Sequence, residues 1–233
     1  MVDGFSVVHD TNPEFDFDPG FRDYVTATYF NAGKLQPEKY DVFPPDRERA
    51  RDVVHYAWTD DGIVLFEHDD IAIAGRTYCA DRREYERIAL LHDERVAHWL
   101  STVLALVPPA PPYSESTVGI NLFRTRTSVV SGPHQDDEQL VLVYVVGRQA
   151  EGGDSYLYPL DSDEPLFTAR LEPGHIMIFD DKRFRHSVSP LFPSAMGDDT
   201  YRDAIICTIN NRSTYPFEPI VTAPRINSGW LIT

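Results

Sequence analysis

The feature of this sequence that most constrains its fold is a change of hydrophobic period near residue 113. From there onward, short segments rich in β-branched and aromatic residues follow one another, with turns such as Glu151–Asp154 and Glu172–Gly174 between them. The segment Leu140–Val146 is apolar without a break, which is typical of a strand covered on both faces. Repeated short strands of this kind predict a sandwich or an open jelly-roll barrel.

The preceding segment has a helical pattern. Between residues 82 and 107, apolar residues recur at steps of three and four, and Pro108 and Pro109 end the run. Such a helix would cover one face of the sheet. Scattered aromatic residues in positions 1–45 indicate one or two further short helices, and Ile63–Phe66 is typical of a strand.

We therefore expect a mainly β fold with flanking helices. A single domain of residues 1–233 would combine a mixed N-terminal part (1–112), which supplies the supporting helices, with a jelly-roll core (113–233) that carries the functional site.

Composition limits the partners of this chain. With 21 basic and 37 acidic residues the formal net charge is −16, and a field of that sign repels nucleic acid and anionic membrane surfaces. An anionic substrate would therefore need a local basic anchor. The two cysteines, Cys79 and Cys207, form neither a disulfide framework nor a zinc motif, and no signal peptide or membrane-spanning run is recognised. We expect a cytoplasmic protein.

A candidate metal site begins at His134 and Asp136. Side chains at i and i+2 of an extended segment point the same way, so both can reach one ion. The His-x-acid pattern alone is weak, because His68 and His92 also begin one. His92 lies in the predicted helix, where i and i+2 diverge, and His68 lies upstream of the barrel. His134 directly precedes the most strand-like run of the chain, where a barrel presents ligands.

Two later histidines compete for the role of third ligand. His175 opens an apolar strand after a Pro-Gly turn and is typical of a strand edge, whereas His186 lies in a polar turn that leads into the next strand. The position of His186 favours it. Two imidazoles and one carboxylate leave three adjacent coordination positions open, which is the arrangement of non-haem Fe(II) oxygenases.

Arginines on predicted strands are candidate anchors for anions. An inward-facing Arg202 needs a carboxylate partner, which the distal carboxylate of 2-oxoglutarate would supply; the alternative is a surface salt bridge with Asp203. Arg124 shares a predicted strand face with Ile120 and Leu122, and we expect it to bind a substrate carboxylate, with Arg126 as a weaker candidate. Asp137 and Glu138 would receive an ammonium group, and Tyr144 and Tyr156 would line the pocket or belong to the barrel core.

The stretches "NLFRTRTSVVSGPHQDDEQLVLVYVV", "GGDSYLYPL", "LEPGHIMIFDDKRFRHSVSPL" and "YRDAIICTI" resemble the small bacterial Fe(II)/2-oxoglutarate dioxygenases that hydroxylate free amino acids, the L-isoleucine 4-hydroxylase group. The resemblance implies a double-stranded β-helix of the cupin-like kind, with His134, Asp136 and His186 as iron ligands and Arg202 as the 2-oxoglutarate anchor. Asp137 departs from the family, which usually has glycine there.

The same resemblance implies the chemistry. Fe(II), 2-oxoglutarate and O2 would hydroxylate an unactivated C–H bond of a free amino acid or similar small molecule, with release of succinate and CO2 and with ascorbate helpful in vitro. The carboxylate of Asp136 favours hydroxylation over halogenation. Desaturation or cyclisation of another metabolite on the same iron stays open, as does a non-oxidative metal-binding cupin-like barrel. A homodimer is compatible with the sequence.

Overall fold

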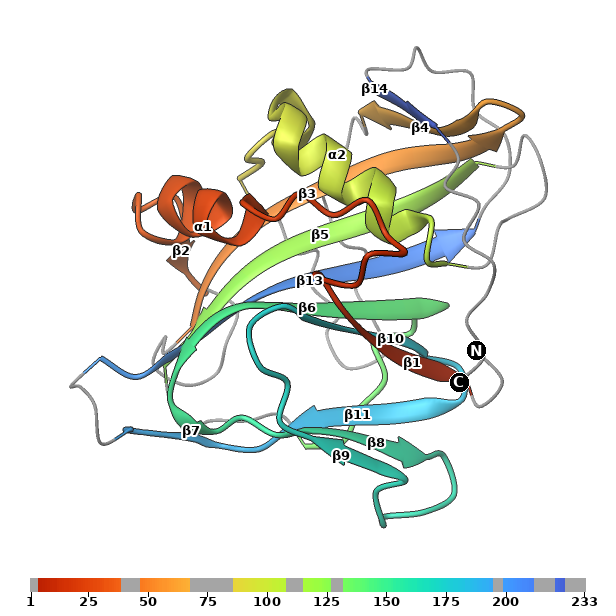
Figure 1. The fold of residues 1–233 in the computed structure, drawn as a ribbon. Helices are drawn as coiled ribbons and strands as arrows, with labels where there is room; N and C mark the ends of the chain where they lie inside the picture. The colour runs from red at the N-terminus through yellow and green to blue at the C-terminus, as the bar shows by residue number, and fades with distance from the viewer. Residues whose placement is uncertain are drawn as a thin grey trace.

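The computed structural model describes residues 4–38, 47–67, 86–107, 115–126, 132–194, 199–211 and 221–224. Its largest element is an antiparallel sheet with the strand order β1-β10-β6-β13-β5-β3-β4-β14, to which β2 adds beside β3 (Figure 1). These strands are β1 (Phe5–His9), β2 (Gln36–Pro37), β3 (Arg47–Thr59), β4 (Gly62–Glu67), β5 (Glu115–Thr125), β6 (Leu140–Gln149), β10 (His175–Asp180), β13 (Tyr201–Asn211) and β14 (Val221–Pro224).

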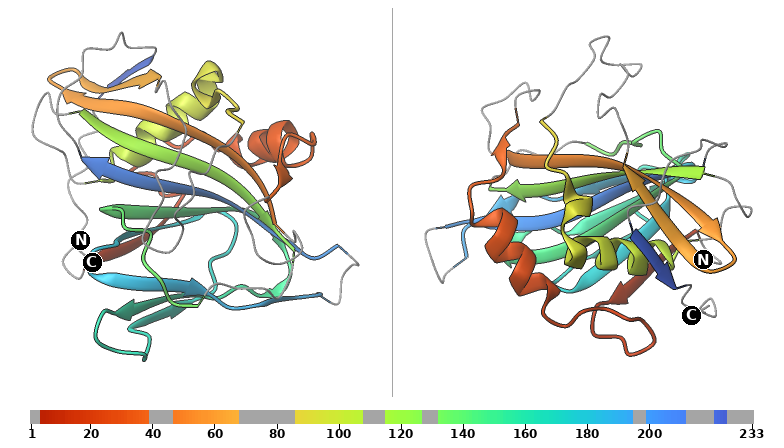
Figure 2. Two further views of the ribbon diagram at one scale, coloured as in Figure 1. Left: turned by 180° about the vertical axis from the view of Figure 1, so that it is seen from behind. Right: turned by 90° about the horizontal axis from the view of Figure 1, so that it is seen from above.

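A smaller sheet, order β11-β8-β9, faces the large one, and β12 pairs with β7 at one end. The strands of the smaller sheet are β8 (Ser155–Pro159), β9 (Phe167–Ala169) and β11 (Phe184–Val188), and β7 (Glu151–Gly152) and β12 (Leu191–Phe192) form a separate two-stranded sheet. Figure 2 shows the two layers from behind and from above. This arrangement is the expected jelly-roll, double-stranded β-helix fold, and that prediction is confirmed.

Strand β6 shows why the middle of the large sheet is apolar on both sides. Leu142, Tyr144 and Val146 pack into the core beneath the helices, whereas Val141, Val143 and Val145 pack against Leu157 and Phe184 of the small sheet. The uninterrupted apolar run of β6 is thus explained by cover on both faces. We call the two sides of the large sheet its helix face and its inner face.

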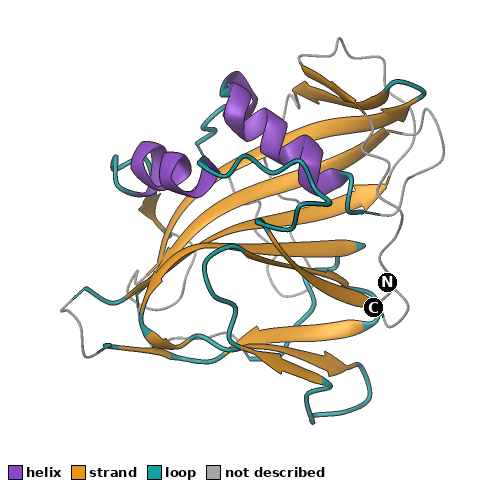
Figure 3. Cartoon of the chain, in the orientation of Figure 1, coloured by secondary structure: helices purple, strands orange, loops and turns teal. Residues whose placement is uncertain are grey.

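The helices lie together on the helix face, as Figure 3 shows in purple. They are α1 (Phe21–Val25), which continues into the π-helical turn η1 (Thr26–Phe30), and α2 (Glu94–Leu104), which follows the 3₁₀ turn η2 (Leu90–His92). Phe21 and Trp99 stack with ring centroids 5.2 Å apart, and Trp99 stacks on Tyr144 of β6 at 5.4 Å. This aromatic column joins α1, α2 and the sheet.

The helix predicted for residues 82–107 begins later than expected. Asp93 caps α2 by accepting bonds from the backbone N–H groups of Arg95 and Val96, at 3.0 Å and 3.3 Å. Immediately before η2, Ala89 has a left-handed backbone with φ of 47°, which ends any continuous helix there. Residues 82–85, Pro108 and Pro109 lie outside the described residues.

The N-terminal part supplies strands as well as the expected helices. Ile63–Phe66 lies within β4, as predicted, whereas β1 and the long strand β3 were not recognised. β1 pairs with β10 and β3 pairs with β5, so strands from both halves of the chain share the large sheet. None of the helices in the described ranges is long and apolar enough to span a membrane.

The aromatic column predicts a specific stability effect. Trp99 is 2% exposed, and Trp99→Ala should lower the free energy of unfolding by about 3–5 kcal/mol, because a large buried ring is replaced by a cavity. Urea unfolding measures the loss, and Trp99→Phe, which keeps a ring against Phe21, should lose less. Equal losses for the two variants would contradict this role of the stack.

Candidate metal centre

The candidate metal centre forms where the loop before β6 lies against β11. His134 and His186 make an isolated antiparallel bridge. The N–H of His134 donates to the carbonyl of His186 over 3.1 Å, and the N–H of His186 donates to the carbonyl of His134 over 2.8 Å. This pair of backbone bonds holds two distant parts of the chain side by side, with ring centroids 4.4 Å apart.

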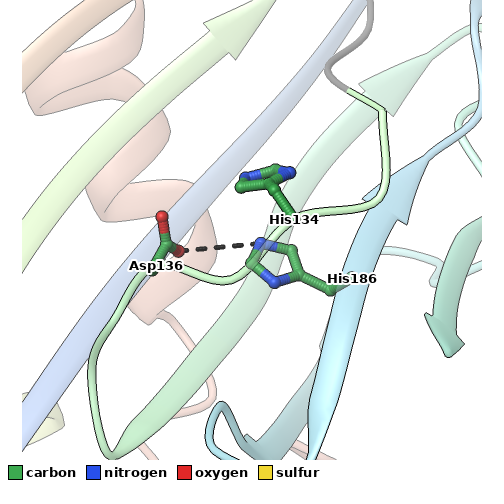
Figure 4. Close-up of side chains that lie close together, drawn as sticks. All are labelled: His134, Asp136 and His186. Carbon is green, nitrogen blue, oxygen red and sulfur yellow. Dashed lines mark ion pairs between the residues drawn. The ribbon is translucent and has the colours of Figure 1, made fainter. Parts of the chain in front are cut away.

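Asp136 completes a group of three. One ligand atom from each of His134, Asp136 and His186 lies within 4.8 Å of the others, and Asp136 Oδ2 is 3.6 Å from His186 Nε2. Figure 4 shows the three side chains turned toward one another. Among the described residues, this is the one group of histidine, cysteine and acidic side chains that converges in this way.

The orientation of His134 leaves a defined atom for a metal. Its Nδ1 lies 2.8 Å from the carbonyl oxygen of Gly132, and since a carbonyl can only accept, Nδ1 carries the proton. Nε2 therefore keeps its lone pair for coordination. Two imidazole nitrogens and one carboxylate oxygen, all half-buried, form a donor set that suits Fe(II) and leaves further positions to other ligands.

The other histidines considered from the sequence lie elsewhere. His175 is the first residue of β10, with its Nδ1 against the backbone of Glu172 and its ring 5.0 Å from that of His9. His92 is exposed and pairs with Glu67 at 2.7 Å. His68 lies outside the described residues.

Arg202 is a buried cation on the inner face. It shares that face of β13 with Ala204 and Ile206, is 6% exposed, and its Nε and Nη2 have no hydrogen-bond partner. Burial, together with the neighbouring charge of Arg148, lowers the pKa of Arg202 to about 10. The alternative of a surface salt bridge with Asp203 is wrong, because Asp203 points to the other face. An unpaired buried guanidinium is costly unless an anion binds it.

Gly153 lies against the side chain of Arg202 at one end of the barrel. Gly153 has a φ of +68°, and a Cβ built there would lie 2.6 Å from Leu191 Cδ2 and 3.5 Å from Arg202 Cδ, so a side chain would crowd this end of the barrel. Ser155 follows on the same strand face as Leu157, and its buried Oγ also has no partner. Arg148, opposite Arg202 in the register, donates to the carbonyls of Leu171, Ala150 and Gly152.

The prediction that Arg124 binds substrate is wrong. Its guanidinium lies on the helix face, where Nε and Nη2 donate to the two carboxylate oxygens of Asp203 at 2.8 Å and 2.7 Å. It also donates to the carbonyl of Phe30 and the side chain of Asn31. The shared face with Ile120 and Leu122 was predicted correctly, but that face packs under the helices.

The prediction that Tyr144 contacts substrate is also wrong. Tyr144 is 0% exposed in the helix-face core, and its hydroxyl donates to Asp10 Oδ2 over 2.8 Å. Burial and the charge of Asp10 raise the pKa of Tyr144. Arg126 pairs at the surface with Asp199.

The acids next to the metal loop have local roles in the structure. Asp137 is exposed and has a φ of 61°, a left-handed conformation that glycine adopts freely and aspartate tolerates. The backbone at this position therefore accommodates the departure from the family's usual glycine. Glu138 accepts a hydrogen bond from the side chain of Asn210, and its backbone N–H donates to Asp181 Oδ2 over 3.1 Å.

Sequence reasoning missed Asp181, Ser155, Gly153 and Arg148. Asp181 gave a weak signal, because it follows a predicted apolar strand and lies near the start of the polar segment that leads to His186. In the sequence, Gly153 was recognised only as part of a turn, and Ser155 only as the start of the strand that follows. Arg148 was hidden by an irregularity in β6: its register with β13 shifts between Asp203 and Ala204, which changes the face on which later residues of β6 lie.

Several solved structures share this fold, and one of them is a dioxygenase. A bsmA homolog from Methylobium petroleophilum is 20% identical with a TM-score of 0.72, covering 89% of this chain and 88% of its own. IDO from Bacillus thuringiensis is 17% identical with a TM-score of 0.64 and coverages of 91% and 92%. The Fe(II)/α-ketoglutarate-dependent dioxygenase TqaL is 11% identical with a TM-score of 0.66 and coverages of 94% and 87%. These likenesses establish a shared fold.

No curated protein sequence matches the chain. The model of the 2OG-Fe dioxygenase family matches residues 39–208, which include the metal loop, His186 and the start of β13. Because this match spans most of the sequence and contains the three converging side chains, the chain belongs to the 2OG-Fe dioxygenase family.

Proposed function

We propose that this chain hydroxylates an unactivated C–H bond of a free amino acid or a similarly small molecule, with 2-oxoglutarate and O2 as co-substrates. The Fe/2-oxoglutarate oxygenase chemistry follows from the family. The observation that carries the site assignment is the convergence of His134, Asp136 and His186 within 4.8 Å. In this proposal these three side chains hold the iron.

The iron and 2-oxoglutarate, when bound, supply the activation of O2, and the co-substrate leaves as succinate and CO2. The protein contributes orientation and shielding. His134 and His186 present their Nε2 atoms from two segments joined by backbone bonds, and the apolar inner face behind them, with Val143 and Leu157, keeps water from the reacting atoms.

We place the distal carboxylate of 2-oxoglutarate against Arg202. Three buried polar atoms without partners, Nε and Nη2 of Arg202 and Oγ of Ser155, match a carboxylate, which accepts several hydrogen bonds. Gly153 has no side chain to crowd Arg202, and the positive charge of Arg148 adds to the attraction for an anion. The residues present therefore fit the co-substrate.

The substrate side of the site needs a different anchor from Arg124. On the inner face, Arg51 of β3 donates to Asn121 Oδ1 over 2.8 Å, and its Nη2 would lie 3.2 Å from a Cβ at Gly119, next to Thr208. We propose Arg51 as the group that meets a substrate carboxylate. Support for an amino acid comes from the resemblance to the amino-acid hydroxylases, and Asp137 and Glu138 are the acids nearest the metal loop in sequence.

Two alternatives use parts of the same site. Desaturation or cyclisation would need the same three ligands, so product analysis has to separate them from hydroxylation. A non-oxidative cupin-like barrel has no need for a buried, unpaired arginine, so Arg202 favours the oxygenase.

The choice of His186 over His175 gives a direct test of the metal site. His186→Ala should abolish Fe(II) binding, measured anaerobically on the metal-free protein, because it removes one of three ligands. His175→Ala is the matched control and should bind Fe(II) like the parent. Loss of binding in the control, with binding kept in His186→Ala, would reverse the assignment.

The buried charge of Arg202 predicts opposite effects on stability and binding. Arg202→Met should leave the free protein as stable as the parent or more so, because an uncompensated buried charge is removed. The same change should weaken 2-oxoglutarate binding by roughly 10–100-fold, because charged hydrogen bonds contribute about 1.5–3 kcal/mol each. Urea unfolding and calorimetric titration with 2-oxoglutarate measure the two effects. Unchanged affinity would remove Arg202 from the site, and Arg170→Met at the exposed surface is the control.

The substrate class is tested by succinate release from 2-oxoglutarate with Fe(II) and ascorbate across the free amino acids. We expect at least one amino acid to stimulate release and to gain one oxygen atom, measured by mass spectrometry. Loss of two hydrogens without oxygen would indicate desaturation or cyclisation. If no amino acid stimulates release while 2-oxoglutarate binds normally, the amino-acid assignment is wrong.

A further inference from the structure

Asp181 is a buried acid that faces the back of His186. It follows β10 directly, is 0% exposed, and its Oδ1 lies 3.7 Å from His186 Nδ1. Neither of these two atoms has a hydrogen-bond partner. Two buried polar atoms that face one another at slightly more than hydrogen-bond distance indicate a bond that a small rotation of either side chain would complete.

The remaining polar groups of Asp181 hold the other half of the site. Its backbone N–H donates to the carbonyl of Gln139 over 3.0 Å, and its Oδ2 accepts from the backbone N–H of Glu138 over 3.1 Å. Its carbonyl accepts from the side chain of Gln135. Asp181 therefore contacts the loop that carries His134 and Asp136 through three groups, and its fourth, Oδ1, points to His186.

The direction of His186 gives this contact a chemical meaning. Its Nε2 is the ring nitrogen that faces Asp136, at 3.6 Å, so Nε2 is the atom available to a metal. Nδ1 must then carry the proton, and a carboxylate is an acceptor for it. At His134 the same task falls to the carbonyl of Gly132. The two imidazoles are thus oriented from behind by different acceptors, one neutral and one anionic.

We propose that Asp181 is a positioning residue for the metal centre. It accepts a hydrogen bond from His186 Nδ1, fixes the ring so that Nε2 points at the ion, and makes that nitrogen a stronger donor. The same carboxylate accepts a hydrogen bond from the backbone N–H of Glu138. It therefore couples the orientation of the His186 ring to the position of the loop that carries His134 and Asp136. This inference rests on the proposed iron site.

The test uses metal affinity and a spectroscopic signature instead of turnover. Metal-free protein is titrated anaerobically with Co(II), whose visible absorption reports both binding and ligand geometry. Asp181→Ala should bind Co(II) about 10–100-fold more weakly than the parent. Asp181→Asn should lie between, because a carboxamide has one oxygen for two donors.

Two matched controls separate positioning of His186 from general support of the loop. Asp180→Asn changes an adjacent acid whose Oδ1 accepts from Lys182 N at the surface, and Gln135→Ala removes a tie between the loop and Asp181 without touching the carboxylate. Both should keep Co(II) affinity within a few-fold of the parent. If Gln135→Ala weakens Co(II) as much as Asp181→Ala does, the loop tie explains the effect and the proposal fails.

A second measurement uses the parent protein and therefore does not depend on the folding of a variant. In the Zn(II)-loaded parent, nitrogen-15 correlation spectra of the imidazoles should show His186 protonated at Nδ1 and metal-bound at Nε2. The reverse pattern would overturn the proposal, as would parent-like Co(II) affinity and absorption in Asp181→Ala. If the parent itself binds neither Co(II) nor Zn(II), the proposed metal site fails before the question of Asp181 arises.

Discussion

The site depends on two backbone hydrogen bonds between His134 and His186. Side chains from a loop and a strand of different sheets would otherwise have to meet through contacts between side chains alone. Because each residue's N–H binds the other's carbonyl, the separation of the two backbones is set by the spacing of paired strands, and the acceptors behind the rings then set the orientation of the imidazoles. Asp136 lies two residues after His134 in an extended segment, so the two side chains point the same way. The three side chains therefore converge with little further adjustment.

The two faces of the large sheet have different roles. The helix face carries the stabilising aromatic column and the buried Arg124–Asp203 pair, whereas the inner face carries Arg202, whose buried Nε and Nη2 have no hydrogen-bond partner. A buried charge that has a protein partner, such as Arg124 with Asp203, contributes to the stability of the fold. Arg202, which is not satisfied, marks a place that only a ligand completes.

The sequence predicted the fold and the converging group because both rest on local patterns. Turns between short strands predicted the jelly roll, and His134 was singled out by its place in a loop before an unbroken apolar run. The prediction that Arg124 binds substrate was wrong because the sequence does not show which face of the sheet the helices cover. Alternation groups it correctly with Ile120 and Leu122, but alternation alone does not say which layer covers that face. The start of α2 was misplaced because one capping residue, Asp93, outweighed a longer apolar period.

Strand β6 gains one residue relative to β13 at Val146, which lies between the paired positions Val145–Ala204 and Gly147–Asp203. Up to that point odd-numbered residues of β6 face the barrel; beyond it even-numbered residues do. The irregularity thus reverses the alternation of side chains along β6. Arg148 faces inward beyond the apolar side chains of Val141, Val143 and Val145, and it adds a positive charge to the inner face. If the same residues of β6 paired with β13 in unbroken alternation, Gly147 would take the inward position and Arg148 would lie on the helix face, so the inner face beside Arg202 would have one positive charge fewer.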